Sequence, residues 1–266
     1  MHVGPPVGRA DTDGGGRTMS PRALPGPLAA LGPRGRRALR RTADAALRPF
    51  GSVNGGRDAH QVAVTFDDGP DGTVTPQLLA VLAQHGVRCT FFLLVDQAER
   101  HPELVRAVRD AGHEIALHGL DHRPLPRMGH GGALSYLRDA RRRLEAVAGT
   151  TVRWYRPPYG LQSPASWAAA RRAGLDVVVW SADAADWEDD PADVVLARAA
   201  AGLTPGGVLL LHERLEPGPD GEPVHTRFDR AALVDLLLTE ADERGMTAVT
   251  VGELSRGGPR RTAWFR

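Results

Sequence analysis

From Asp58 onward, short β-branched apolar runs alternate with longer segments of helical period, and this alternation constrains the fold most. The pattern predicts βα units around a mainly parallel sheet, because parallel strands need long crossovers that helices usually supply. The seven predicted strands are Gln61–Phe66, Cys89–Val95, His113–His118, Val152–Tyr155, Asp176–Trp180, Gly207–His212 and Met246–Val251. The predicted helices lie near residues 75–85, 99–111, 131–148, 164–173, 192–202 and 228–244.

Seven strands with intervening helices predict an α/β fold. A distorted, incomplete (β/α) barrel with about seven parallel strands suits this count best, and a doubly wound open sheet is the alternative. The chain has 266 residues, of which 42% are hydrophobic, enough to bury a full core. In both folds, functional side chains gather at the carboxyl ends of the strands.

The chain divides into three predicted parts. Residues 1–57 are rich in Gly, Pro and Arg and lack a strand-like run, so we expect them to be mostly disordered. Residues 58–256 form the predicted folded domain, and residues 257–266 a C-terminal tail. The first 50 residues carry nine arginines against three aspartates; a short basic helix exposed to solvent is the favoured interpretation, and a weak membrane-surface contact of this segment is the alternative. Because the whole chain has a net charge of only +1, the remainder is acidic, and we expect no nucleic-acid partner.

Targeting signals are few. No apolar run reaches the length of a membrane-spanning helix, and no apolar stretch follows the N-terminal arginines as in a secretory signal. The sequence therefore predicts a place in the cytoplasm or at the cytoplasmic membrane face, or outside the cell if the start is misassigned.

The single cysteine, Cys89, excludes a disulfide framework and a multi-cysteine zinc site. We expect a monomer.

Polar clusters follow five of the predicted strands. Residues 65–70 (TFDDGP) end the first, and residues 118–122 (HGLDH) end the third. Residues 156–160 (RPPYG) follow the fourth, residues 183–187 (DAADW) follow the fifth, and residues 210–212 (LLH) close the sixth. In a closed barrel these strand ends surround one mouth, which predicts a single functional site.

Two of these clusters contain metal-binding residue types. Adjacent carboxylates on an extended chain point to opposite sides, so Asp67 and Asp68 can serve as a base and a metal ligand, although a DDGP sequence alone is typical of a turn. His118 and His122 have the i, i+4 spacing that places two imidazoles on one side of a helical turn. With Asp68 they give a His₂Asp set with open positions, as a catalytic ion requires. Zinc is the default ion, and cobalt, nickel or iron can use the same ligands.

With these clusters, the sequence resembles the NodB-homology polysaccharide deacetylases, a carbohydrate esterase family of metal-dependent N- and O-deacetylases. The resemblance covers roughly residues 58–256 and includes all five family motifs in order. It implies a distorted (β/α) barrel and a hydrolase that removes acetyl groups from N-acetylated sugars. It also implies that Asp67 is the general base and His212 the general acid. Asp68, His118 and His122 would hold one divalent metal ion.

The remaining motif residues have supporting roles in this resemblance. Arg156 would orient the base, and Asp186 would hold Arg156 in turn. The backbone N–H of Tyr159 would stabilise the oxyanion, while Trp187 and Leu210 would form the wall that receives the acetyl methyl group.

Two positions depart from the family pattern, Gly119 and, with little weight, Glu213, which follows the acid histidine where Asp is common. Gly119 follows the first ligand histidine, where the family usually has Ser or Thr. A hydroxyl at this position would support the metal-binding loop, and loss of such outer contacts often costs 10–100-fold in affinity or activity. The glycine therefore implies weaker metal binding or another group that replaces the hydroxyl.

Two alternatives to a sugar deacetylase stay open. A non-catalytic carbohydrate-binding module on this fold predicts the loss of at least one base, acid or ligand residue, and none is lost. A hydrolase acting on the C–N bond of a small non-sugar amide would retain the same residues. Among sugars, chitin fragments, peptidoglycan, exopolysaccharides and glycolipid or biosynthetic intermediates all present an N-acetyl group.

Overall fold

The computed structural model describes residues 51–216, 224 and 226–263. The predicted disorder and membrane contact of residues 1–50 therefore lie outside the described residues. None of the helices in the described part of the chain is long and apolar enough to cross a membrane.

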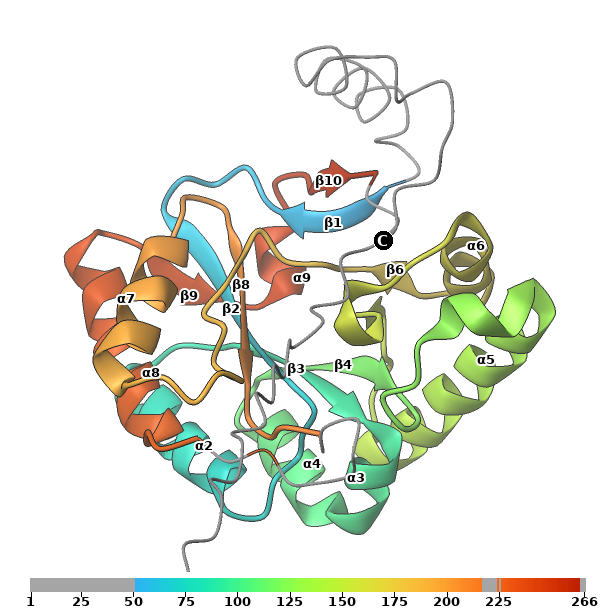
Figure 1. The fold of residues 1–266 in the computed structure, drawn as a ribbon, viewed down its shortest axis with the longest axis horizontal. Helices are drawn as coiled ribbons and strands as arrows, with labels where there is room; N and C mark the ends of the chain where they lie inside the picture. Colours follow the sequence, from blue (N-terminus) through green and yellow to red (C-terminus); the bar gives the residue numbers. More distant parts are fainter. Residues whose placement is uncertain (1–50, 217–223, 225, 264–266) are drawn as a thin grey trace, which may run out of the picture. The chain divides into compact units, whose positions relative to one another are not determined.

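Eight strands form one parallel sheet in the order β6-β5-β4-β3-β2-β8-β7, with β9 also paired to β2. Their bounds are β2 Gln61–Asp67, β3 Thr90–Leu94, β4 Glu114–Gly119, β5 Trp154–Tyr155, β6 Asp176–Val177, β7 Ala182–Asp183, β8 Val208–His212 and β9 Thr247–Val249. The sheet curls and carries helices around it (Figure 1), which confirms the predicted incomplete (β/α) barrel.

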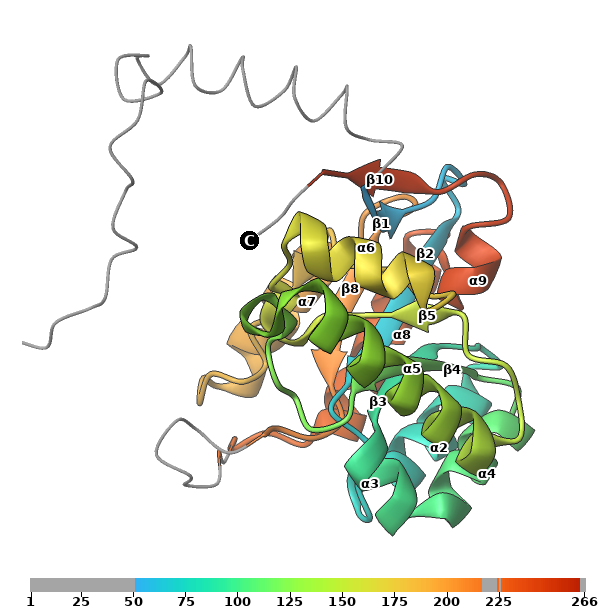
Figure 2. The same ribbon diagram turned by 90° about the vertical axis from the view of Figure 1, so that its right-hand side faces the viewer.

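Helices α7, α8, α2, α4, α5 and α6 follow one another as packing neighbours around the sheet (Figure 1), and Figure 2 shows α5 and α6 side by side. The α-helices are α2 Val74–Gln84, α3 Val95–Arg100, α4 Pro102–Asp110, α5 Gly129–Ala148, α6 Pro164–Arg172, α7 Ala192–Gly202, α8 Arg230–Glu243 and α9 Val251–Leu254, and the 3₁₀ turns are η3 Leu125–Met128 and η4 Pro158–Gly160. Side chains define several helix starts. The Asp229 carboxylate accepts hydrogen bonds from two backbone N–H groups of the first turn of α8, which satisfies donors that a helix start leaves free.

Two apolar clusters hold the barrel together. The larger one lies between the sheet and the helices, and it includes Phe66 of β2, Leu78 of α2 and Leu237 of α8. The smaller one contains Phe92 of β3 and Trp154 of β5 together with smaller apolar residues, most of them on strands and two on helix α9. Because side chains alternate along a strand, the two clusters use opposite faces of the same sheet.

The folded body extends beyond residues 58–256 on both sides. Strand β1, Ser52–Gly55, pairs antiparallel with β10, Arg260–Thr262. Both strands fall in parts that the sequence assigned to a disordered segment and a tail. Each strand is too short to show a local periodicity in the sequence. Their pairing joins the beginning and the end of the folded part of the sequence, so neither segment alone indicates its partner.

The predicted strand Asp176–Trp180 is wrong in its second half. Strand β6 ends at Val177, and Val178, whose N–H still donates to the Tyr155 carbonyl of β5 at 2.9 Å, also bridges to Val53 of β1. The Val179 N–H donates to the Val53 carbonyl at 2.7 Å. The chain then forms the separate strand β7 beside β8. The apolar run of residues 176–180 is therefore continuous in sequence, while the strand to which its backbone bonds changes from β5 to β1.

The predicted helix over residues 99–111 is two helices in the structure. Helix α3 ends at Arg100, and α4 begins at Pro102. The residue before a proline is disfavoured in helical conformation, so His101 breaks the run with a backbone φ of −128° and ψ of 55°.

Candidate active site

The strand ends bring most of the predicted residues to one cavity of about 690 Å³. Asp67 is the last residue of β2, His212 is the last residue of β8, and His118 lies next to the end of β4. The predicted residues that line the cavity are Asp67, Asp68, His118, His122, Tyr159, Trp187, Leu210 and His212. A cavity of this size is typical of a site for a small ligand or part of a polymer.

Both adjacent carboxylates face the cavity, contrary to the expectation of opposite directions. Asp67 shares the inner face of β2 with Ala63 and Thr65 because strand side chains alternate. Asp68 leaves the extended conformation with a φ of 70°, in the left-handed region. This turn brings its carboxylate back to the same mouth.

Asp68, His118 and His122 place one ligand atom each within 4.8 Å of one another. Asp68 Oδ1 lies 3.3 Å from His118 Nε2 and 3.5 Å from His122 Nε2. This oxygen is buried and has no hydrogen-bond partner among the described residues. An oxygen and two nitrogens in this arrangement fit a divalent metal ion.

The hydrogen bonds of the two histidines suit a ligand role. His118 Nδ1 lies 2.9 Å from the Arg156 carbonyl oxygen and donates to it, so the Nε2 lone pair points to the cavity. His122 sits in the loop after β4 with a φ of 58°, so the i, i+4 pair does not lie on a helical turn as predicted. Burial lowers the pKa of His122 to about 4, which keeps its imidazole neutral as a metal ligand must be.

Arg156 and Asp67 form a buried ion pair. Arg156 Nη1 donates to Asp67 Oδ1 at 2.6 Å and to Thr65 Oγ1 at 2.8 Å. The guanidinium lies 4.0 Å from the centre of the Phe92 ring and is fully buried. These contacts fix the Asp67 carboxylate, whose other oxygen lies 3.7 Å from His118 Nε2.

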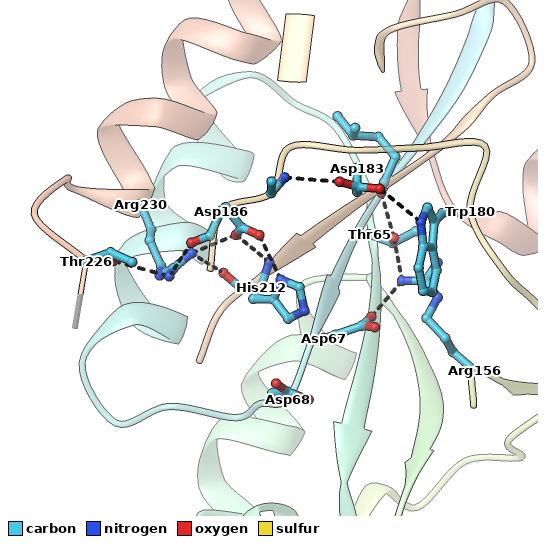
Figure 3. A network of polar contacts seen from close by, with 12 residues as sticks. Thr65, Asp67, Asp68, Arg156, Trp180, Asp183, Asp186, His212, Thr226 and Arg230 are labelled. Atoms are coloured by element: carbon cyan, nitrogen blue, oxygen red, sulfur yellow. Dashed lines mark hydrogen bonds and ion pairs between the residues drawn. The ribbon is translucent and has the colours of Figure 1, made fainter. Parts of the chain in front are cut away.

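The prediction that Asp186 holds Arg156 is wrong. Figure 3 shows Asp186 between His212 and Arg230. Asp186 Oδ1 lies 2.7 Å from His212 Nδ1, and Oδ2 accepts from Arg230 Nη1 at 2.7 Å and from the His212 backbone N–H at 2.8 Å. The unpredicted strand β7 explains the difference, because it places Asp186 beside the end of β8 rather than β5.

This arrangement sets the charge of His212. Burial alone would lower the pKa of His212, but the Asp186 carboxylate and its hydrogen bond raise it to about 9. Burial would likewise raise the pKa of Asp186, and His212 and Arg230 hold it below its ordinary value. His212 is therefore protonated at neutral pH and can donate a proton into the cavity.

Aromatic side chains form the walls. Tyr159 is 59% exposed, has a left-handed backbone with a φ of 58°, and packs its ring 4.4 Å from that of His122. The Trp187 and His212 ring centres lie 5.5 Å apart, edge to face.

Several residues of the site were not predicted from the sequence. Leu215, Glu216 and Val224 line the cavity without having been expected there, beside Trp180 and Asp183 of the predicted fifth strand and the cluster that follows it. Arg230 lies behind the cavity as the first residue of α8. Arg230 stands 18 positions after His212 and belongs to no sequence motif, so its contact with His212 can be recognised only in the folded structure.

Comparison with known proteins identifies the family. Residues 54–178 match the family described as polysaccharide deacetylase. A chitooligosaccharide deacetylase from Sinorhizobium fredii is 36% identical over 163 residues, which are 61% of this chain and 76% of the relative. The chain belongs to the polysaccharide deacetylase family. A peptidoglycan-N-acetylglucosamine deacetylase from Bacillus cereus is 32% identical over 197 residues, 73% of this chain and 88% of the relative.

The solved structure of a deacetylase shares the fold. The Bc1960 peptidoglycan N-acetylglucosamine deacetylase superposes with a TM-score of 0.68 at 28% identity, over 79% of this chain and 94% of that one. The family comparison confirms the resemblance to NodB-homology polysaccharide deacetylases and the expectation of an N-deacetylase enzyme.

Proposed function

We propose that this polysaccharide deacetylase is a metal-dependent hydrolase that removes acetyl groups from N-acetylated sugars. The observation that carries the proposal is the convergence of Asp68, His118 and His122 beside Asp67 and His212 in one cavity. Relatives named as chitooligosaccharide and peptidoglycan-N-acetylglucosamine deacetylases support a sugar substrate.

Asp68, His118 and His122 would hold the metal ion. When bound, a divalent ion lowers the pKa of a coordinated water and polarises a carbonyl oxygen. Zinc fits an oxygen and two nitrogens with open positions, and cobalt, nickel or iron accept the same ligands.

Asp67 acts as the general base in this proposal. Arg156 holds one carboxylate oxygen and leaves the other directed to the ligand group. The oxygen of a water molecule attacks the acetyl carbonyl carbon, and Asp67 accepts the proton that this water loses. Such assistance typically contributes about 10²–10⁴-fold to the rate.

His212 acts as the general acid. The Asp186 carboxylate keeps its imidazole protonated at neutral pH. When the C–N bond of the tetrahedral intermediate breaks, His212 transfers its proton to the departing sugar nitrogen. The products are acetate and a free amine, and no covalent enzyme intermediate is required.

The cavity walls position the acetyl group. The backbone N–H of Tyr159 is the proposed oxyanion donor, a type of contact worth roughly 3–4 kcal/mol in the barrier. Trp187 and Leu210 are the proposed wall around the methyl group, because both are apolar and line the same cavity as His212.

Acetate release tests the proposal. Chitooligosaccharides, peptidoglycan fragments and lipid-linked or nucleotide-linked N-acetylglucosamine are each incubated with untreated protein, with chelator-treated protein and after zinc or cobalt is added back. We expect release from at least one sugar, loss with chelator and recovery with metal. If the metal-loaded protein releases acetate only from small non-sugar amides, or from none of these substrates, the proposal that it deacetylates sugars is wrong.

A further inference from the structure

We propose that the hydroxyl of Tyr136 clamps the loop between the two ligand histidines and thereby holds His122 in its metal-binding position. The loop comprises residues 119–122, and Tyr136 lies on the neighbouring helix α5. The proposal rests on the proposed function in one respect, since it takes His118 and His122 as metal ligands.

One hydroxyl makes three hydrogen bonds to this loop. Tyr136 Oη accepts from the backbone N–H of Leu120 at 2.7 Å and from that of Asp121 at 3.3 Å. It donates to Asp121 Oδ1 at 2.9 Å. A hydroxyl offers one donor and two acceptor positions, so this group is used to capacity.

The two histidines differ in what holds them. His118 belongs to β4, and its Nδ1 is tied to the Arg156 carbonyl. His122 has a left-handed backbone, and its Nδ1 is buried without a hydrogen-bond partner in the described part of the chain. The position of the His122 ring therefore depends on the backbone of the two residues before it, which are the residues that Tyr136 holds, and on its contact with Tyr159.

Gly119 makes room for this clamp. A Cβ atom at residue 119 would lie 3.0 Å from Tyr136 Oη, closer than an ordinary contact, and the φ of 130° is unfavourable for any side chain. Any side chain at this position would displace the hydroxyl or strain the backbone. The hydroxyl that the loop lacks at residue 119 is thus supplied from α5.

Zinc affinity of the purified protein, measured by competition with a chromophoric chelator, tests the clamp without any substrate. Tyr136→Phe keeps the ring and removes the hydroxyl, and we expect its zinc dissociation constant to rise about 10–100-fold. Tyr155→Phe is the matched control. Its hydroxyl is also buried but makes no hydrogen bond to the described residues, so its zinc affinity should equal that of the wild type.

Two further readouts separate a clamp from a general packing role. The visible spectrum of the cobalt-loaded protein should change in Tyr136→Phe and not in Tyr155→Phe, because the geometry at His122 changes. Asp121→Ala removes the acceptor of the Tyr136 proton and should weaken zinc binding in the same direction, by less than Tyr136→Phe. This second variant decides the question if Tyr136→Phe does not fold.

Unchanged zinc affinity and an unchanged cobalt spectrum in folded Tyr136→Phe would overturn the clamp alone. Lower thermal stability of the metal-free variant with unchanged zinc affinity would also overturn it. Failure of the wild-type protein to bind either ion would overturn the proposed function together with the clamp.

Discussion

Asp67 and His212 are register partners on the neighbouring parallel strands β2 and β8. Side chains at paired positions of a parallel sheet point to the same face, so the proposed base and acid enter the cavity side by side. Each has its own charged partner: Arg156 lies against Asp67, and Asp186 lies against His212. The contacts of the proposed base and of the proposed acid can therefore be changed separately by mutation.

Asp186→Asn should move the alkaline limit of activity. In the wild type we expect kcat to fall as pH rises through about 9, because His212 then loses the proton it donates. Without the Asp186 carboxylate, burial is opposed only by the smaller effects of Asp67 and Asp68, and we expect the pKa of His212 to fall to or below its ordinary value of about 6.5. At pH 8 the variant should retain less than about a tenth of wild-type activity, since each pH unit beyond the pKa costs about tenfold.

The pH profile of acetate release checks this prediction. Asp183→Asn is the control, because Asp183 lines the same cavity but bonds to Trp180 rather than to His212. Its alkaline limb should stay in place. An Asp186→Asn profile that coincides with that of the wild type would refute the role of Asp186.

Arg230→Gln should destabilise the fold. The substitution removes a cation that bonds to the buried Asp186 carboxylate and to the His212 carbonyl oxygen. Breaking a buried ion pair typically costs about 3–5 kcal/mol in the free energy of unfolding. Arg230→Lys keeps the charge and should lose less. Denaturant unfolding of both variants gives the answer, and a free energy within about 1 kcal/mol of the wild type for Arg230→Gln would contradict the prediction.

The strand-end residues show how far the sequence reaches. Asp67, His118 and His212 could be placed at one mouth because β-branched runs mark their strands and parallel strands share a carboxyl edge. The apolar run after Asp176 also looks like one strand, but Val178 bridges to Val53 of β1 and a new strand, β7, begins at Ala182. A local sequence pattern cannot show that a strand more than a hundred residues away, here β1, will bond to part of the run.

The same limit explains the error at Asp186. The sequence shows that Asp186 belongs to a motif, but it does not show that Asp186 contacts His212. That contact depends on the pairing of β7 with β8. Tyr136 and Arg230 lie on helices α5 and α8 and reach the site only through packing. Neither stands in a pattern that indicates chemistry.

Glu213→Gln should flatten the dependence of stability on pH. Glu213 is buried, and burial raises its pKa to about 8 from the ordinary 4.5. Because the folded-state pKa lies above the unfolded one, the stability contributed by the protonated form is complete below about 4.5 and is lost as pH rises through about 8. Glutamine stays neutral throughout this range.

The melting temperature of the metal-free protein between pH 5 and pH 9 measures this effect. We expect the fall in Tm over this interval to be smaller in Glu213→Gln than in the wild type by about 4 °C or more. Thr75→Val is a useful control, because it removes the hydrogen bond to Glu213 but leaves the carboxyl group to titrate. Equal falls in the wild type and Glu213→Gln would show that Glu213 does not carry the dependence.

The most direct test of the proposed base and ligand roles compares Asp67→Asn with Asp68→Asn, measuring bound zinc per protein and acetate release from the best sugar substrate in the same preparations. Asp67→Asn should bind one zinc ion like the wild type but lose at least about 10²-fold in kcat. Asp68→Asn should lose zinc. An Asp67→Asn protein with near wild-type kcat, or a zinc-free protein that still releases acetate, would contradict the division of base and ligand between these two neighbours.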